Sequence, residues 1–331
     1  MKKKMRPLLR CVIFLLILSL LLTAATWVVI PKRNAKADGM HNARAYGYLA
    51  EKENTIDIAI IGDSETYASF SPMELWKDYG YTGFICGTSA QHLEDTYGTL
   101  KQFCEYQSPK LVILEANAMF RSSGLYSDIE RVFFREIEKA MPLFEYHDRW
   151  KRLSPQDFTG RVEYDCIDPL KGFYPTYYSK EWKGGHDYMK KTDKVRPIQN
   201  VNLYYFDKIV EFCREREIPL LVTSAPAPVN WNYQKHNAIK RLTDKYGLPY
   251  LDMNFSSEEM DIDWSHDSRD GGDHMNVYGA LKVTSFLGKY LDEKYDLPDH
   301  RSDKKYANWE RDLKDYQDIL NRGMKKQTSK K

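Results

Sequence analysis

A short apolar run that ends in Gly62-Asp63-Ser64 limits the possible folds of this chain more than any other stretch. Residues 56–61 are apolar apart from Asp57, which predicts a buried parallel strand covered on both faces. Gly62 permits a sharp turn, so Ser64 comes to the carboxyl end of the strand, where open α/β sheets bind their ligands. A hydroxyl there can act as a nucleophile if a base reaches it. Capping of the next helix by Asp63 or Ser64 is the simpler alternative.

Strands and helices alternate along most of the chain. The apolar patterns predict strands at about 55–61, 83–86, 110–115, 218–224 and 248–253, and helices at about 72–79, 91–106, 202–216, 233–246 and 276–295. Such alternation is typical of α/β proteins, in which helices cover both faces of a parallel sheet. We therefore expect a five-stranded parallel sheet.

Residues 118–200 interrupt this alternation. A charged amphipathic helix at about 127–140 is followed by a long stretch rich in tyrosine, tryptophan and phenylalanine. So long an insertion with little regular structure favours a lid or a substrate surface. A packed subdomain with an aromatic core fits the same pattern.

The first residues have the composition of a membrane anchor. Residues 1–10 are basic and 11–30 are almost uninterruptedly apolar, which predicts a cytoplasmic segment, one membrane-spanning helix and export of the remainder to the extracellular face. Cleavage near Ala37 would instead release a secreted protein. A stalk at 31–54 then leads into a domain at 55–300. The tail at 301–331 includes a charged helix at 303–323, for which a solvated surface is the simplest interpretation and contact with a membrane partner an alternative.

Charge and cysteine content narrow the chemistry. Residues 1–37 hold eight basic and no acidic residues, so the exported part carries 41 basic and 47 acidic groups, a net charge of −6. Nucleic-acid binding, which needs a basic face, is therefore not expected. The four cysteines outside the apolar run allow disulfides, but their predicted positions in strands and helices favour buried free thiols. No cysteine pair suggests zinc, and no cofactor is expected.

Four groups that follow separate strands have complementary chemistry. Ser64 offers a hydroxyl, Gly87 a backbone N–H open to close approach, and Asn117 a side-chain amide. Two such donors aimed at one point would form an oxyanion hole. His274, which opens the helix at 276–295 after an acidic loop, is the candidate base for Ser64.

In these blocks the sequence resembles the SGNH hydrolase superfamily, the GDSL-like esterases, over about residues 55–295 without the insertion. The resemblance implies a flavodoxin-like three-layer α/β sandwich and a serine nucleophile in Gly62-Asp63-Ser64. It also implies an oxyanion hole and a histidine base oriented by an aspartate, and the matching residues are Ser64, Gly87 and Asn117 for the hole, His274 for the base, and Asp270 or Asp273 for the aspartate.

Three positions depart from the family pattern. Glu65 stands where leucine is usual, Glu115 precedes the asparagine block where glycine is usual, and Gly271 occupies the position of the aspartate in Asp-x-x-His. Either Asp270, with one extra residue, or the adjacent Asp273 must then orient the histidine, and we favour Asp270.

The function implied is acyl transfer through a serine ester. The resemblance is strongest to membrane-anchored members related to the accessory protein for teichoic acid D-alanylation and to alginate O-acetylation proteins. It implies an esterase or O-acyltransferase acting on a cell-surface polysaccharide or teichoic acid, with a membrane-bound O-acyltransferase as a candidate partner. Glu65, Trp231 and Asn276 are candidate substrate contacts.

Two other interpretations stay open. In the first, the same fold is catalytically inactive and binds a cell-wall polymer or a membrane acyltransferase. In the second, the acidic loop at 261–272 binds calcium, although His266 replaces the central glycine and Gly272 the terminal glutamate of such loops. We therefore predict no metal site.

Overall fold

The chain folds into two compact units, each assembled from segments that are distant in the sequence. The computed structural model describes residues 2–122, 124–184 and 187–329. The helical unit comprises Met1–Ala43 and Gly124–Cys166, and the sheet unit comprises Arg44–Ser123 and Ile167–Lys331. The predicted insertion at 118–200 is thus divided between them. The stalk predicted at 31–54 is divided too, since its second half lies in the sheet unit.

The sheet unit is built on five parallel strands. They are β1 (Ile58–Ile61), β2 (Gly83–Ile85), β3 (Leu111–Glu115), β4 (Leu220–Ser224) and β5 (Tyr250–Asp252), in the order β2-β1-β3-β4-β5. Every residue of β1, β2, β3 and β4 is buried, as expected for parallel strands covered on both faces. β1 begins later than predicted because the backbone N–H groups of Thr55 and Ile56 donate to the Gln107 side chain instead of a strand.

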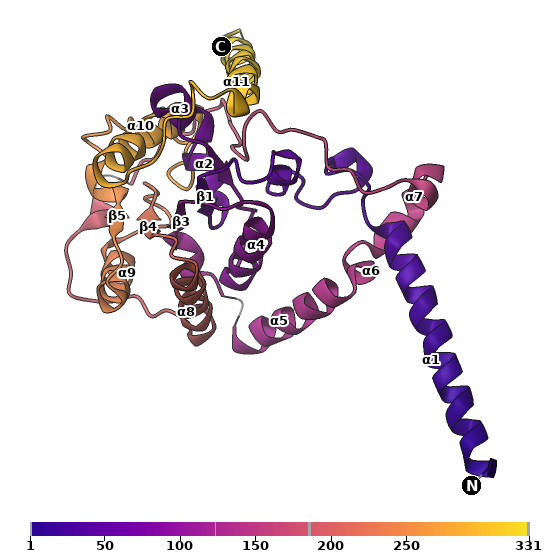
Figure 1. The fold of residues 1–331 in the computed structure, drawn as a ribbon. Coiled ribbons are helices and arrows are strands. Elements are labelled where there is room, and N and C mark those ends of the chain that lie inside the picture. The colour runs from indigo at the N-terminus through magenta and orange to yellow at the C-terminus, as the bar shows by residue number, and fades with distance from the viewer. Residues whose placement is uncertain (1, 123, 185–186, 330–331) are drawn as a thin grey trace. The chain divides into compact units, whose positions relative to one another are not determined.

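Helices cover both faces of this sheet (Figure 1). On one side lie α2 (Ser64–Ser69), α3 (Pro72–Tyr79) and α10 (Val277–Lys294), and on the other α4 (Leu93–Tyr106), α8 (Asn200–Glu215) and α9 (Tyr233–Tyr246). This is the expected three-layer α/β sandwich with a five-stranded parallel sheet. The carboxyl ends of the strands share one edge, so the loops after β1, β3 and β4 meet there. Of the four cysteines predicted to be buried free thiols, Cys86 and Cys213 are buried, whereas Cys104 and Cys166 are partly exposed, and all four are free.

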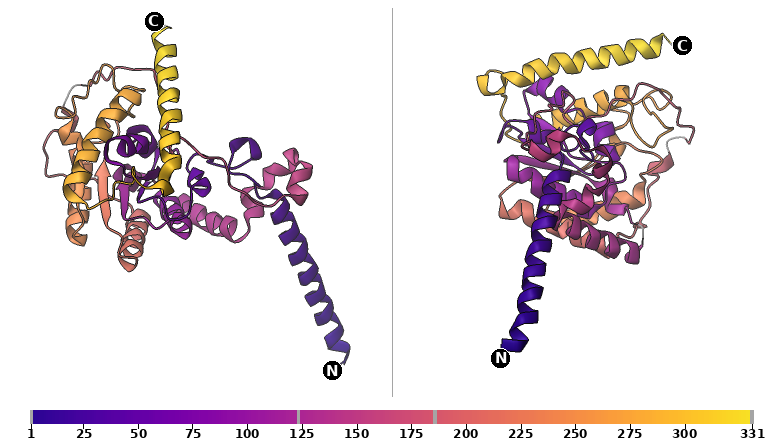
Figure 2. Two further views of the ribbon diagram at one scale, coloured as in Figure 1. Left: turned by 45° about the horizontal axis from the view of Figure 1, so that its top comes forward. Right: turned by 90° about the vertical axis from the view of Figure 1, so that its right-hand side faces the viewer.

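The C-terminal helix α11 (Ala307–Thr328) belongs to the sheet unit and packs against α3 (Figure 2). Trp309 is fully buried, with its ring centroid 5.5 Å from that of Trp76. Lys171 Nζ lies 2.6 Å from a carboxylate oxygen of Glu51 and 2.6 Å from one of Asp312, and this group is buried. The interpretation of residues 303–323 as a solvated charged helix was therefore wrong.

The helical unit is formed by α1 (Lys2–Val29) and by the first part of the insertion. That part consists of α5 (Leu125–Ala140), α6 (Pro142–Glu145), a 3₁₀ segment at His147–Arg152 and α7 (Pro155–Thr159). Within the described part of the chain, one helix is long and apolar enough to cross a membrane, the Pro7–Val29 portion of α1. This fits a signal anchor, and a cleaved signal peptide would have the same features.

Candidate active site

The turn after β1 places Ser64 at the carboxyl edge of the sheet. Gly62 has φ +147°, and a Cβ atom there would lie 2.8 Å from Thr66 Cγ2 and 3.0 Å from Glu115 Cβ, so the turn requires glycine. Asp63 is the N-cap of α2, and its side chain accepts a hydrogen bond from the backbone of Glu65. Ser64 is the first residue of α2 and does not perform the capping itself.

His274 reaches Ser64 from the loop that precedes α10. Its Nε2 lies 2.8 Å from Ser64 Oγ, although 210 residues separate the two in the sequence. The side chain of Asn276 accepts hydrogen bonds from two backbone N–H groups at the start of α10 and thereby caps that helix. The hydroxyl and the imidazole are thus positioned by the N-terminal ends of two different helices.

Asp270 holds the other nitrogen of this imidazole. Its Oδ2 lies 2.7 Å from His274 Nδ1, and its Oδ1 accepts a hydrogen bond from the His274 backbone N–H. The nearest Asp273 oxygen lies 3.4 Å from the same Nδ1. Gly271 and Gly272 both have positive φ and form the turn that brings Asp270 back to the histidine across one extra residue. Geometry therefore favours Asp270 over Asp273 as the partner.

The hydrogen bonds to His274 also keep Asp270 ionised. Partial burial on its own raises the pKa of the Asp270 carboxyl, but the hydrogen bonds from the His274 ring and backbone outweigh it and lower the pKa overall. An ionised Asp270 favours the tautomer that carries its proton on Nδ1 of His274. In this tautomer Nε2 is free to accept a proton from Ser64.

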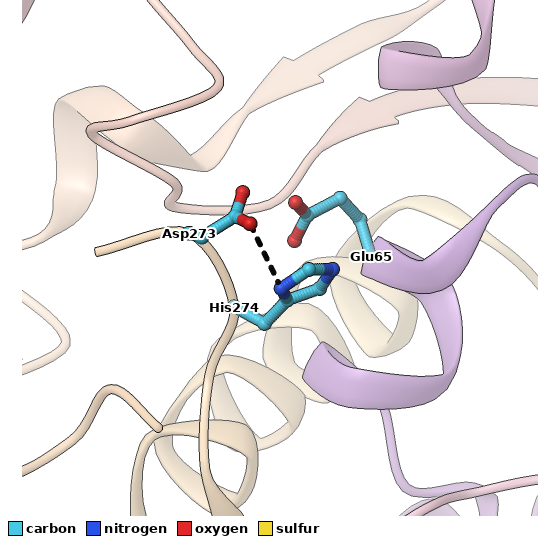
Figure 3. A group of neighbouring side chains, drawn as sticks. All are labelled: Glu65, Asp273 and His274. Carbon is cyan, nitrogen blue, oxygen red and sulfur yellow. Dashed lines mark ion pairs between the residues drawn. The ribbon is translucent and has the colours of Figure 1, made fainter. Parts of the chain in front are cut away.

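Glu65 and Asp273 both lie beside the His274 ring (Figure 3). The side chain of Asn230 joins the two carboxyl groups. The Asn230 amide donates to both carboxyl groups. Glu65 is buried, and burial, reinforced by the charges of Asp63 and Glu115, raises its pKa well above the usual range. Burial thus favours the protonated form of the Glu65 carboxyl.

These groups do not form a ready metal site. Glu65, Asp273 and His274 offer ligand atoms within 4.8 Å of one another. However, both His274 nitrogens already face Ser64 and Asp270, so a metal ion would have to displace one of these contacts. The calcium-like loop is occupied in a similar way, since Asp267 accepts hydrogen bonds from the Asp263 backbone and from Lys282.

Gly87 and Asn117 both lie beside the Ser64 turn. A Cβ at Gly87 would lie 2.7 Å from the Asp63 carbonyl oxygen, so only glycine lets these two backbone segments approach so closely. Asn117 follows β3, and its Nδ2 donates to Asp63 Oδ2 over 3.1 Å. An amide nitrogen has two hydrogens, so one remains for a ligand. The structure thus brings Ser64, Gly87, Asn117 and His274 to one edge of the sheet.

Lys235 was not anticipated from the sequence. It lies in the first turn of α9, where it resembles any helical lysine, but its ammonium donates to Asn117 Oδ1 over 3.1 Å and to the Asn230 carbonyl. Since an ammonium can only donate, it fixes the Asn117 oxygen on its own side and turns Nδ2 toward Asp63. No residue spacing signals such a contact across 118 residues.

Two predicted substrate contacts have structural roles instead. Trp231 is buried, and its indole N–H donates to Asp252. Asn276 is also buried, and its amide nitrogen donates to Ser179 Oγ and to the His266 carbonyl. Both side chains hold loops together, and neither is available to a substrate in this conformation. Of the three candidates, only Glu65 lies against His274.

Comparisons with known proteins add little to these observations. No family model matches the chain, and no curated protein matches it. Among solved structures it is similar to a protein assigned as an acylhydrolase from Bacteroides fragilis, with 12% identity, a TM-score of 0.38 and coverage of 75% of this chain and 93% of that one. It is also similar to a GDSL-like lipase from Bacteroides thetaiotaomicron, with 12% identity, a TM-score of 0.40 and coverage of 76% of this chain and 98% of that one. A third similar structure is a protein of the lipolytic G-D-S-L family from Desulfitobacterium hafniense, with 14% identity, a TM-score of 0.38 and coverage of 72% of this chain and 100% of that one. At these scores the fold rests on the topology described above, and function rests on the site.

Proposed function

We propose that this chain is a serine-dependent acyl esterase or O-acyltransferase of the SGNH type, anchored to the membrane by α1 and acting outside the cell. The observation that carries the proposal is the continuous chain of hydrogen bonds from Ser64 Oγ through His274 to Asp270, with distances of 2.8 and 2.7 Å. A nucleophile, a base and an orienting carboxylate in this order are the parts that acyl transfer requires.

The reaction proceeds in two steps. In the first, His274 Nε2 takes the Ser64 proton as Oγ bonds to the acyl carbonyl carbon, and the resulting oxyanion accepts hydrogen bonds from the Ser64 and Gly87 N–H groups and from Asn117. Collapse of this intermediate expels the alcohol, which takes the proton from His274. In the second step His274 deprotonates water or a sugar hydroxyl, which attacks the acyl-serine and restores Ser64. Water gives hydrolysis and a sugar hydroxyl gives transfer.

A cell-envelope glycan or teichoic acid is the substrate we propose. The apolar α1 supports a location at the membrane, and a membrane-bound O-acyltransferase would be a suitable acyl donor for a chain anchored beside it. The side chains of Ser64, His274, Asp270 and Asn117, with the backbone N–H groups of Ser64 and Gly87, supply all the chemistry of the proposed steps, so the mechanism uses no cofactor.

A second candidate function, binding of an envelope polymer without catalysis, is favoured by a groove in the sheet unit. The groove has a volume of about 540 Å³ and is lined by Tyr174, Tyr177 and Tyr178 and by Arg322 and Lys326 of α11. Among the described residues, no carboxylate pairs with either of these two cations. Tyrosine rings and cations that no described carboxylate neutralises suit an anionic sugar or polyol chain.

A fluorophosphonate probe separates the two functions. With the full-length protein in detergent micelles, we expect covalent labelling, with the adduct mapped by mass spectrometry to Ser64, and hydrolysis of a chromogenic acetyl ester. Hydrolysis of acetylated sugars tests whether the protein removes acyl groups from a glycan. A protein that binds an anionic glycan but is labelled at no serine would contradict the enzymatic proposal and support the binding function.

Lys235 provides a test of the oxyanion hole. Lys235→Met should lower kcat by about 10- to 100-fold with little change in KM, because the Asn117 amide loses the contact that orients it. Lys235→Arg should restore part of the rate, because it also donates. Lys240→Met, which removes an exposed lysine of the same helix paired with Asp244, is the matched control. A loss of thermal stability without a change in kcat would assign Lys235 a purely structural role.

A further inference from the structure

The helical unit exposes a set of large apolar side chains that no other described residue of the unit covers. On α5 the exposed fractions are 82% for Tyr126, 60% for Ile129 and 62% for Phe133. These three residues recur at intervals of three and four, so they form one stripe along the helix. A contiguous exposed apolar stripe of this kind marks an interaction site, whereas single exposed apolar residues are common on protein surfaces.

The polar residues of α5 pair with one another along the helix. Asp128 is buried, and its Oδ1 lies 2.9 Å from the Arg131 guanidinium. The Arg135 guanidinium lies 3.2 Å from a carboxylate oxygen of Glu138. The buried Asp128 lies on the side of the helix away from the aromatic stripe, so the stripe faces outward. This orientation is the reverse of a helix that packs into a soluble core, where the apolar stripe faces inward.

The segment that follows α5 is fastened to the end of α1. Arg149 is buried, donates to the Val29 carbonyl at the last turn of α1, and pairs with Asp157 over 2.7 Å. Close to this point Lys32 donates to the Trp27 carbonyl and holds its ammonium 4.1 Å above the Trp27 ring. Aromatic rings and lysines that gather at the end of an apolar helix are typical of the boundary between membrane and water.

Further exposed aromatic residues lie close in sequence to Arg149. Trp150 is 65% exposed and Phe158 56% exposed, and Lys151 and Arg152 are exposed beside them. Since Arg149 ties this segment to Val29, these rings belong to the level at which the apolar span of α1 ends. Rings at that level suit the glycerol and headgroup region, and exposed cations suit lipid phosphates.

We infer that the helical unit is a membrane-interface module, in which α5 and the segment at 147–159 lie in the headgroup region of the bilayer that α1 spans. The occupant of the exposed aromatic surface is phospholipid. This inference requires α1 to be retained as an anchor and is independent of the proposed acyl chemistry. Its consequence for the protein is that a chain with one spanning helix has a second, lateral attachment to the same membrane.

Photo-crosslinking tests the inference with the intact chain. The full-length protein carries p-benzoylphenylalanine in place of Phe133 or Trp150, one site per variant, and is reconstituted into vesicles of phosphatidylglycerol and phosphatidylethanolamine. After irradiation, phospholipid adducts are measured by mass spectrometry. We expect about tenfold more adduct at these two positions than at the control positions, because interfacial residues are buried among lipid headgroups and acyl chains.

Three reference positions make the result decisive. Lys139 is exposed on the polar side of α5, and Tyr204 is exposed in the sheet unit, so both should give little lipid adduct. Leu20 of α1 should give abundant adduct and verifies reconstitution. Crosslinks from residue 133 or 150 to the sheet unit or to a second protein chain, or lipid adducts no more abundant than at residue 139, would overturn the inference. All substituted side chains are exposed, so the variants should fold.

Discussion

Ser64→Ala should lower kcat for ester cleavage by about 10⁶-fold, since removal of the nucleophile leaves only binding and the oxyanion hole. The described contact of Ser64 Oγ is with His274, so the variant should keep its melting temperature within a few degrees of the parent protein. Initial rates with a chromogenic acetyl ester measure the loss. Such a small residual rate demands protein free of contaminating esterases.

Ser89→Ala is the matched control for this experiment. Ser89 lies in the loop after β2 and hydrogen-bonds to the Tyr67 hydroxyl over 2.7 Å, but it has no place in the proposed mechanism. Its rate should stay near that of the parent protein. Substantial activity in Ser64→Ala, with a rate that follows the protein through purification, would refute Ser64 as the nucleophile.

Asp270→Asn should lower kcat by about 10⁴-fold, because an amide in place of the carboxylate favours the wrong histidine tautomer and cannot stabilise the imidazolium. Asp273→Asn is its counterpart at the neighbouring carboxyl, and there we expect a loss of no more than about tenfold. The prediction follows from the two distances to His274 Nδ1, 2.7 Å from Asp270 and 3.4 Å from Asp273. Steady-state kinetics of both variants, with circular dichroism to verify folding, provide the comparison.

Which of the two variants loses more kcat identifies the carboxylate that orients His274. If Asp273→Asn is the more damaging change, Asp273 is the orienting carboxylate and the Asp270 contact is a feature of the resting conformation. Equal losses of about 10²-fold or more would mean that the two carboxyl groups act as one unit around the imidazole.

The sequence was sufficient for the architecture of the sheet unit because its signals are local. Each strand is a short apolar run followed by a helix with its own periodicity, and this alternation allows few topologies. The candidate active site was predictable for a related reason. Ser64 and Asn117 each closely follow a predicted strand. Because open α/β sheets bind ligands at the carboxyl ends of their strands, this position alone indicates a site. The prediction of His274 needed a chemical argument in addition to its position, because a serine nucleophile needs a base.

Other features depend on contacts that no local pattern encodes. Lys235 orients Asn117, which lies 118 residues away in the sequence. Asn230 joins Glu65 and Asp273, which lie 165 and 43 residues away from it. By contrast, the error at α11 was avoidable. Trp309, Leu313, Tyr316 and Leu320 recur at intervals of three and four and form a buried stripe, which the abundance of charge in that segment concealed.

The discontinuous make-up of the helical unit has a consequence for biosynthesis. The contact between Arg149 and Val29 joins residues 120 positions apart, so the end of α1 is synthesised long before its partner has been translated. N-terminal regions generally fold first during synthesis, but this unit cannot be completed until residue 166 has left the ribosome. Meanwhile residues 44–123, which begin the sheet, must wait for strands from the other side of the insertion. Synthesis and folding of the helical unit are therefore coupled over about half of the chain.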